Sequence, residues 1–277
     1  DKAVAKIKET FTPNCVPLFV FNGTGSNVVA LQLMTRPYHS IFCAETAHIY
    51  VDECGSPVKM TGCQIRPIAT PDGKLTPELM QPYLHGFGDQ HHSQPRALYI
   101  SQCTELGTIY TPEELKRLTD FAHLNGMYVH MDGARLSNAV AYLGCDPRDI
   151  TSRVGIDVLS FGGTKNGMMF GEAVVFFNPE VAKEVQYIRK QLMQLHSKTR
   201  FIAAQYAALQ GSAHSYALIR VQALAWFMSC QLFYFILYSR DTCRTTNQKD
   251  FAQFRSGQSC ICQCSSYRFC CQFYQIM

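Results

Sequence analysis

Two hydrophobic periods alternate along residues 1–213. Short apolar runs bounded by Gly, Pro or Asn predict strands at 16–22, 65–69, 96–101, 127–131, 156–161 and 173–178. Apolar residues spaced three and four apart predict helices at 2–11, 27–36, 111–126, 134–144, 179–195 and 200–210. Because strands and helices alternate, we expect an α/β fold with three layers, in which a mostly parallel sheet is flanked by helices on both faces.

Capping residues mark several of the predicted helix starts. Thr111, which precedes a proline, is typical of a helix N-cap, and Pro77 is expected at the first position of a further helix. After the turn NGTGSN, either Ser26 or Asn27 is expected near the N-cap of the next helix. These signals locate the turns that separate strands from helices.

Polar residues follow four of the predicted strands directly. In a mostly parallel sheet these carboxyl ends meet at one edge, where ligands of such folds bind. The four segments are Gly-Thr-Gly-Ser-Asn at 23–27, Gln-Cys-Thr-Glu at 102–105, Asp-Gly-Ala-Arg at 132–135 and Gly-Gly-Thr-Lys at 162–165. We therefore expect the functional site of this chain at that edge.

Each segment also has a simpler interpretation when it is taken alone. Glycine-rich turns are common, Asp132 could cap the helix that follows it, and Lys165 could extend from a loop into water. Together the segments offer a phosphate cradle at a helix N-terminus, a buried acid, a lysine and an arginine. Pyridoxal phosphate would use all four, with the acid on its ring nitrogen, the lysine in a Schiff base with its aldehyde, and the arginine on a substrate carboxylate.

Composition favours a globular enzyme over other classes. The chain has 277 residues, of which 47% are hydrophobic and 17% charged, with a formal net charge of +4. Such a chain can bury one large or two modest cores, and it lacks the dense runs of Lys and Arg expected of a nucleic-acid surface. No signal peptide is recognised, and the six cysteines before residue 213 are typical of the free thiols of a cytoplasmic enzyme.

Residues 214–277 differ from the rest of the chain. They hold seven of the 13 cysteines and show no alternation of strand and helix. The apolar run at 223–238 is slightly short for a membrane span, and the spacing of Cys260, Cys262 and Cys264 fits no common zinc site. We expect a cofactor-binding major domain at 1–213 and an atypical tail at 214–277, with no metal site and no membrane association.

Five motifs, in this order, resemble those of the low-specificity threonine aldolases. They are FNGTGSN, ETAHIYVDECGSP, HMDGAR, FGGTKNG and GEAVVFFN, and the resemblance covers residues 1 to 213. These aldolases belong to the fold-type-I pyridoxal-phosphate enzymes of the aromatic β-eliminating lyase and threonine aldolase group. Relative to them, this chain resembles a form truncated at both ends, without the small C-terminal domain and its second carboxylate-binding arginine.

The resemblance assigns roles to the residues at the strand ends. By this resemblance Lys165 forms the Schiff base, Asp132 pairs with the pyridine nitrogen, and Arg135 binds the substrate carboxylate. The phosphate would be held by Gly23, Thr24, Gly25 and Thr164.

Three further residues receive roles only through the resemblance. His48 matches the family histidine that stacks on the cofactor ring and helps in proton transfer, although a polar loop histidine is the simpler interpretation. Asp52 could point into the same pocket or lie at the surface, and Arg200 falls where the family has a basic residue near the phosphate.

The implied reaction is retro-aldol cleavage of threonine, allo-threonine and related β-hydroxy-α-amino acids to glycine and an aldehyde, in a homodimer or homotetramer. Many family members carry a second histidine where this chain has Thr104 and Glu105, so the general base stays open among His48, Asp52 and a water molecule. The alternatives are a pyridoxal-phosphate β-eliminating lyase and an inactive remnant of the fold.

Overall fold

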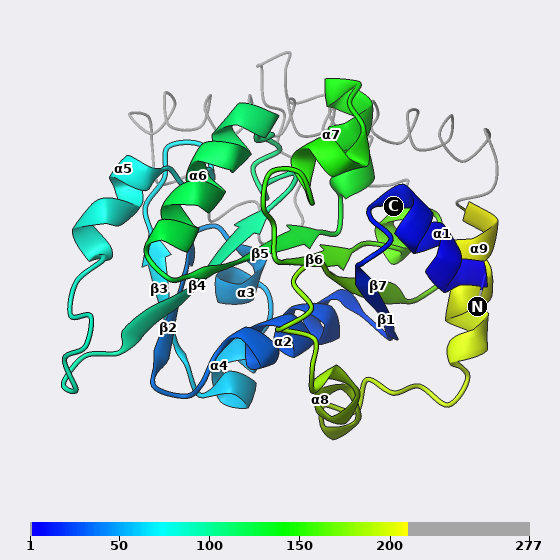
Figure 1. The fold of residues 1–277 in the computed structure, drawn as a ribbon, viewed down its shortest axis with the longest axis horizontal. Helices are drawn as coiled ribbons and strands as arrows, with labels where there is room; N and C mark the ends of the chain where they lie inside the picture. Colours follow the sequence, from blue (N-terminus) through cyan, green and yellow to red (C-terminus); the bar gives the residue numbers. More distant parts are fainter. Residues whose placement is uncertain (1, 210–277) are drawn as a thin grey trace, which may run out of the picture. The chain divides into compact units, whose positions relative to one another are not determined.

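A computed structural model describes residues 2–209 of the chain, and within them seven strands form one sheet (Figure 1). The strands are β1 (Val16–Val20), β2 (His39–Ala44), β3 (Gln64–Ile68), β4 (Gln94–Ser101), β5 (Tyr128–Gly133), β6 (Val158–Phe161) and β7 (Glu172–Phe176). Their order across the sheet is β1-β7-β6-β5-β4-β2-β3. The strands β2 to β6 pair in parallel, whereas β7 is antiparallel to both β6 and β1, so the prediction of a mostly parallel sheet is confirmed.

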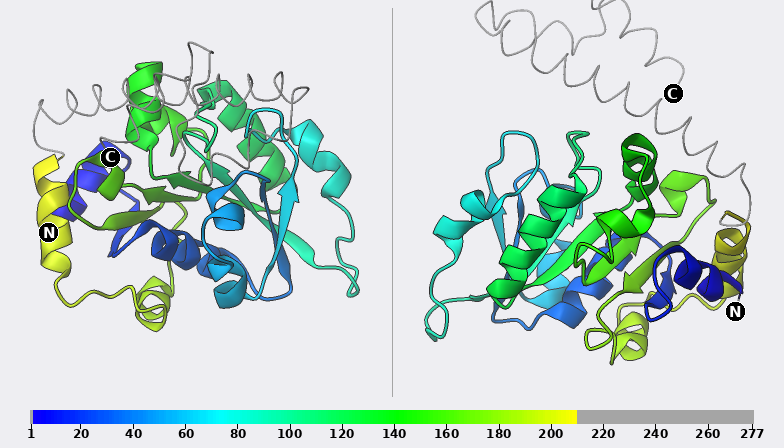
Figure 2. Two further views of the ribbon diagram at one scale, coloured as in Figure 1. Left: turned by 180° about the vertical axis from the view of Figure 1, so that it is seen from behind. Right: turned by 45° about the horizontal axis from the view of Figure 1, so that its top comes forward.

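Helices connect these strands and flank the sheet. The α-helices of the described residues are α1 (Lys2–Thr10), α2 (Gly23–Met34), α3 (His48–Val51), α4 (Ser56–Thr61), α5 (Pro77–Met80), α6 (Pro112–Leu124), α7 (Leu136–Leu143), α8 (Val185–Gln191) and α9 (Thr199–Leu209). Short 3₁₀ turns are η1 (Gln81–Tyr83), η2 (Pro147–Ile150) and η3 (Thr164–Asn166). The helices α1 and α9, from the two ends of the described chain, lie side by side (Figures 1 and 2).

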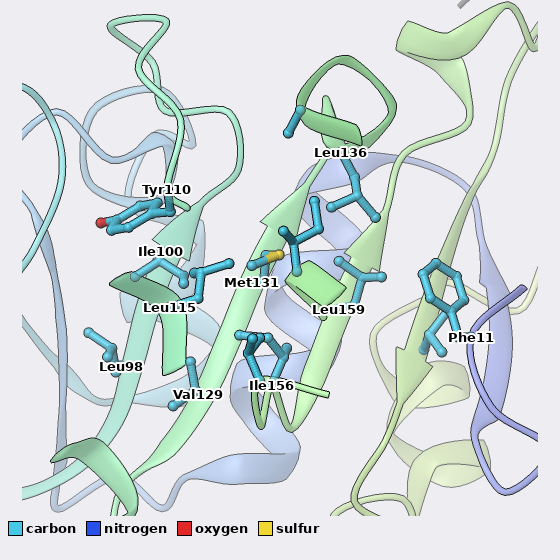
Figure 3. Close-up of a cluster of buried hydrophobic side chains, with 14 of the residues drawn as sticks. Phe11, Leu98, Ile100, Tyr110, Leu115, Val129, Met131, Leu136, Ile156 and Leu159 are labelled. Atoms are coloured by element: carbon cyan, nitrogen blue, oxygen red, sulfur yellow. The ribbon is translucent and has the colours of Figure 1, made fainter. Parts of the chain in front are cut away.

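The two faces of the sheet pack against different helices because successive strand residues point to opposite sides. On β4, Leu98 and Ile100 belong to one buried cluster, which includes residues of α1, α6, α7 and α9. Figure 3 shows part of that cluster, in which Met131 lies between Ile100 and Leu159. Ala97 and Tyr99 belong to a second cluster, which is filled by α2 and α8. Helices therefore cover both faces, as the alternating pattern predicted.

Most predicted helix starts are found, but the start of α2 differs. Thr111 caps α6 through a capping box with Glu114, as expected. For α2 the N-cap is Asn22, whose side chain accepts a hydrogen bond from the Gly25 N–H at 2.7 Å. The helix thus begins at Gly23, because a cap was available before the glycines, and Ser26 and Asn27 are buried inside it.

Other elements differ from the sequence prediction. The short helices α3 and α4 and the strand β2 were not predicted, although the β2 run Ser-Ile-Phe-Cys-Ala is buried between β3 and β4. The helix expected over 179–195 is limited to α8, because Val181 and Ala182 pack into the α2 cluster from a non-helical turn.

The predicted tail at 214–277 lies outside the described residues, and the boundary at 213 remains a prediction. Among the described residues, none of the helices is both long enough and apolar enough to span a bilayer.

Backbone segments after β5 and β6 approach each other closely at the carboxyl edge of the sheet. The Gly162 N–H donates to the Gly133 carbonyl at 3.1 Å. A Cβ atom at position 162 would overlap the Ala134 backbone, which cannot move as a flexible side chain could. Glycine at this position therefore allows the segment that carries Lys165 to lie against β5.

We predict that Gly162→Ala lowers the free energy of unfolding by about 1–3 kcal/mol, because the new methyl group forces two backbone segments apart. Urea denaturation of the cofactor-free protein measures this change. Gly23→Ala is the matched control, since nothing lies within 4 Å of a Cβ there, and its stability should equal or slightly exceed that of the wild type. Equal stability of the two variants would contradict the close approach.

Candidate active site

Asp132 ends β5 as a buried carboxylate with three hydrogen-bond donors. Its Oδ2 accepts from the Tyr99 hydroxyl at 2.6 Å and from Asn27 Nδ2 at 3.1 Å, and its Oδ1 accepts from the Ala134 N–H at 2.9 Å. Burial acts to raise the pKa of Asp132, but these three hydrogen bonds outweigh it and the pKa is lowered. Asp132 is therefore ionised at neutral pH.

Asn27 connects this carboxylate to other elements. Its Oδ1 accepts from Ser160 Oγ at 2.9 Å, and its Nδ2 donates to Glu53 Oε1 at 2.8 Å in addition to Asp132. The side chain is 1% exposed. One amide thus joins α2, β5, β6 and the loop after α3.

His130 is a buried, neutral ring that contacts Ser160, the partner of Asn27. Ser160 donates its single hydroxyl proton to Asn27, so the contact of 3.0 Å between Ser160 Oγ and His130 Nε2 requires the histidine to donate. Burial lowers the pKa of His130 to about 4, despite the nearby Asp132. His130 therefore supports the group without carrying charge.

His48, at the start of α3, faces the same site from another element. Its Nδ1 lies 3.0 Å from Glu53 Oε1, and its side chain is 30% exposed while that of Glu53 is fully buried. The hydrogen bond to Glu53 is the largest influence on the ring and raises the pKa of His48, with a smaller contribution from Asp132.

Of the two positions that the sequence left open for Asp52, the structure shows the surface one, and the adjacent Glu53 lies in the site instead. Asp52 is exposed at the C-cap of α3 and does not join this group, whereas the next residue, Glu53, is buried against His48 and Asn27. The loop offered no periodicity from which the buried acid could be identified.

Lys165 lies in η3, directly after β6, and its segment is held by Glu172 from β7. The Glu172 carboxylate accepts from the backbone N–H groups of Gly163 at 2.5 Å and Thr164 at 3.4 Å. Burial raises the pKa of Glu172, although these hydrogen bonds act in the opposite direction. Thr164 itself is exposed, and its hydroxyl lies 3.5 Å from the Gly171 carbonyl oxygen.

Lys165 shares its electrostatic environment with Arg135 and several carboxylates. Partial desolvation and then Arg135 lower the pKa of Lys165, against the opposite effects of Asp132, Glu172 and Glu105. Lys165 remains accessible to solvent, so its amine is only partly desolvated. A lowered pKa favours the neutral amine, which is the form that attacks carbonyl groups.

Glu105 also contributes to the site, although the sequence indicated it only as a departure from the expected histidine. It accepts from Ser101 Oγ at 2.6 Å and from the His48 backbone N–H at 3.0 Å. Burial raises the pKa of Glu105, and the Asp132 charge adds to this effect. Among the described residues, no group of three or more His, Cys, Asp or Glu side chains could hold a metal ion.

The glycine-rich turn forms the first turn of α2. The space next to Gly23 is open, and Gly25 packs against the side-chain amide of Gln194, which also accepts from the Phe21 N–H at 3.0 Å. The N–H groups of a first helical turn have no acceptors within the helix, and the helix dipole is positive there. The Gly25 N–H is already donated to Asn22 Oδ1 at 2.7 Å, so the N–H groups of Gly23 and Thr24 are the candidates for binding an anion.

The structure brings together most of the residues predicted for the site. Asp132, Lys165, Arg135 and His48 share one electrostatic neighbourhood at the carboxyl edge of the sheet. Arg200 is exposed in the first turn of α9, with its guanidinium 4.9 Å from the centre of the Phe201 ring, and no contact joins it to that group.

Two sequence relatives are named low-specificity L-threonine aldolase. The chain is 44% identical over 203 residues to a low-specificity L-threonine aldolase of Pseudomonas aeruginosa, covering 73% of this chain and 59% of that protein. A second, from Pseudomonas sp., is 44% identical over 209 residues, covering 75% of this chain and 60% of that protein. The chain thus spans about 60% of the length of these curated relatives.

Solved structures share the fold. A threonine aldolase of Leishmania major matches with a TM-score of 0.75 and 31% identity, covering 79% of this chain and 64% of that one. An aspartate aminotransferase variant of Thermus thermophilus matches with a TM-score of 0.63 and 14% identity, covering 87% of this chain and 66% of that one, and indicates the fold alone. The sequence profile of the beta-eliminating lyases matches residues 2–256, which is most of the chain. This chain therefore belongs to the beta-eliminating lyase family.

Proposed function

We propose that this protein catalyses the pyridoxal-phosphate-dependent retro-aldol cleavage of L-threonine, L-allo-threonine and related β-hydroxy-α-amino acids to glycine and an aldehyde. The observation that carries the proposal is the ionised, buried Asp132 facing Lys165 and Arg135 at one edge of the sheet. Relatives named low-specificity L-threonine aldolase, at 44% identity, support this reaction above others of the fold.

The residues present fit pyridoxal phosphate. Asp132 Oδ1 accepts from the Ala134 N–H, and a carboxylate oxygen has room for a second donor such as a protonated ring nitrogen. The open space at Gly23, next to the positive end of α2, suits the phosphate. Lys165 would bind the aldehyde, and Gly23, Thr24, Gly25 and Thr164 would hold the phosphate, with Arg200 only if α9 shifts towards it.

When bound, the cofactor supplies an acceptor for the electrons of the broken Cα–Cβ bond. The contribution of Asp132 is to keep a ring nitrogen protonated, which requires a carboxylate that stays ionised. Tyr99 and Asn27 ensure this, because both donate to its Oδ2. A neutral residue at 132 would remove that charge.

The substrate would be bound by its carboxylate and deprotonated at its β-hydroxyl. Arg135, which begins α7 and lies near Lys165, offers the planar guanidinium that suits a carboxylate. His48 donates its Nδ1–H to Glu53, so its Nε2 carries the lone pair that accepts the hydroxyl proton. The exposed position of Asp52 favours His48 as this base.

Two properties of the whole protein are part of the same proposal. We expect a homo-oligomer, a dimer or tetramer, because related sites form between subunits. We also expect a reducing compartment such as the cytoplasm, because the cysteines of the described residues are free thiols.

Lys165→Ala should abolish the absorbance band of lysine-bound cofactor when pyridoxal phosphate is added to the purified protein, because Lys165 is the lysine near Asp132 within residues 2–209. Absorbance spectroscopy measures the band. Lys183→Ala, which removes an exposed lysine paired with Glu180, is the control and should keep it. A band that survives in Lys165→Ala would show that another residue binds the aldehyde.

L-Threonine added to the cofactor-loaded protein should yield glycine and acetaldehyde in equal amounts, because the proposed cleavage breaks the Cα–Cβ bond. Amino-acid analysis and an alcohol dehydrogenase assay measure the two products. A 2-oxo acid with ammonia would instead indicate β-elimination, and no product from loaded protein would indicate a non-catalytic chain.

The rate should fall as the pH decreases through a value above 6.5, the ordinary pKa of histidine, because Glu53 raises the pKa of His48 and the protonated ring cannot accept a proton. A profile of kcat/KM for L-threonine against pH measures this limb. His48→Gln should flatten it. A limb that is unchanged in His48→Gln would exclude His48 as the base.

A further inference from the structure

Glu53 is a buried acid that none of the sequence motifs indicated as functional. Its Oε1 lies 3.0 Å from His48 Nδ1 and 2.8 Å from Asn27 Nδ2. Its Oε2 is buried and, within residues 2–209, has no hydrogen-bond partner. Burying a carboxylate with one unsatisfied oxygen is energetically unfavourable. A neighbouring cation compensates for this, so the interaction between the two is strong.

Asn27 fixes where this carboxylate lies. An amide nitrogen has two hydrogens, and here they serve Glu53 Oε1 and Asp132 Oδ2. Reversing the amide would place its oxygen against both carboxylates, so Nδ2 must face them and Oδ1 accepts from Ser160 Oγ at 2.9 Å. The two carboxylates are thus held on either side of one neutral donor.

We propose that Glu53 is a positioning residue for His48, and that Asn27 links its carboxylate to that of Asp132, so that the supports of the His48 ring and of the cofactor ring nitrogen form one buried unit. The role in catalysis rests on the proposed function, whereas the contacts themselves do not. Through this unit, Glu53 fixes the ring of His48 and the tautomer with its proton on Nδ1.

The charges that face His48 come from four directions. Glu53 contacts the ring, Asp132 approaches from β5, and Lys165 from the segment after β6, while Glu105 accepts from the backbone N–H of His48. Glu53 is the largest influence and raises the pKa of His48, Asp132 adds to it, and Lys165 opposes it. Removing the Glu53 charge should therefore change the pKa of His48 more than removing any of the other three charges.

The test is the pKa of His48 in the full-length protein without cofactor, measured by NMR titration of the ring and assigned by the signal that disappears in His48→Gln. Glu53→Gln should lower this pKa by about one pH unit, because it removes the adjacent negative charge. Asp52→Asn is the matched control, since it removes a neighbouring but exposed carboxylate, and it should leave the pKa of His48 unchanged.

A second variant separates the charge of Glu53 from its position. Asn27→Ala removes the donor that holds Glu53 but leaves its charge, so the pKa of His48 should fall by less than in Glu53→Gln. If Glu53→Gln does not fold, Glu53→Asp withdraws the carboxylate by one methylene and should still lower the pKa.

Three results would overturn the proposal. They are an unchanged pKa of His48 in a folded Glu53 variant, an equal decrease in Asp52→Asn, and a decrease in Asn27→Ala as large as that in Glu53→Gln. Because cofactor and substrate are absent from the titration, its failure is distinguishable from failure of the proposed reaction, which the product assay tests.

Discussion

The site depends on keeping one carboxylate charged although it is largely buried. Burying an unpaired carboxylate costs several kcal/mol, so the chain must provide donors around Asp132. It does so with Tyr99 from β4, Asn27 from α2 and the Ala134 N–H that follows β5. These donors need hydrogen-bond partners of their own, as Asn27 has in Ser160. Polar side chains therefore occupy buried positions that a sheet of this kind would otherwise fill with apolar residues.

The helix α2 meets two requirements that compete for its first turns. In the proposed function its N-terminus presents the N–H groups of Gly23 and Thr24 to an anion, while the Gly25 N–H is donated to Asn22. Its next residues reach into the sheet to Ser160 and Asp132. Capping by Asn22, rather than by Ser26 or Asn27, meets both, because it places the glycines in the first turn and leaves the two polar side chains for the buried group. A helix starting at residue 27 could not do this.

The parts that could be predicted from sequence are those that follow from periodicity and strand ends. Asp132 and Lys165 were found because each follows a buried strand, and their approach results from the parallel pairing of β5 with β6. Glu53 could not be found in this way, because it lies in a loop where burial changes between adjacent residues and Asp52 is chemically equivalent in the sequence. The sequence indicated Glu105 only as a position where related enzymes have a histidine. No sequence pattern predicts that its carboxyl group accepts a hydrogen bond from the His48 backbone N–H.

The carboxyl groups around Lys165 are distinguished by their donors rather than by their residue type. Asp132 receives three hydrogen bonds from Tyr99, Ala134 and Asn27, and its pKa is lowered in spite of burial. Glu105 and Glu172 also accept hydrogen bonds, but burial dominates and raises the pKa of both. Environments that push pKa values apart in this way assign separate roles to chemically similar groups. Asp132 is the fixed charge, whereas burial makes the ionised forms of Glu105 and Glu172 less favourable.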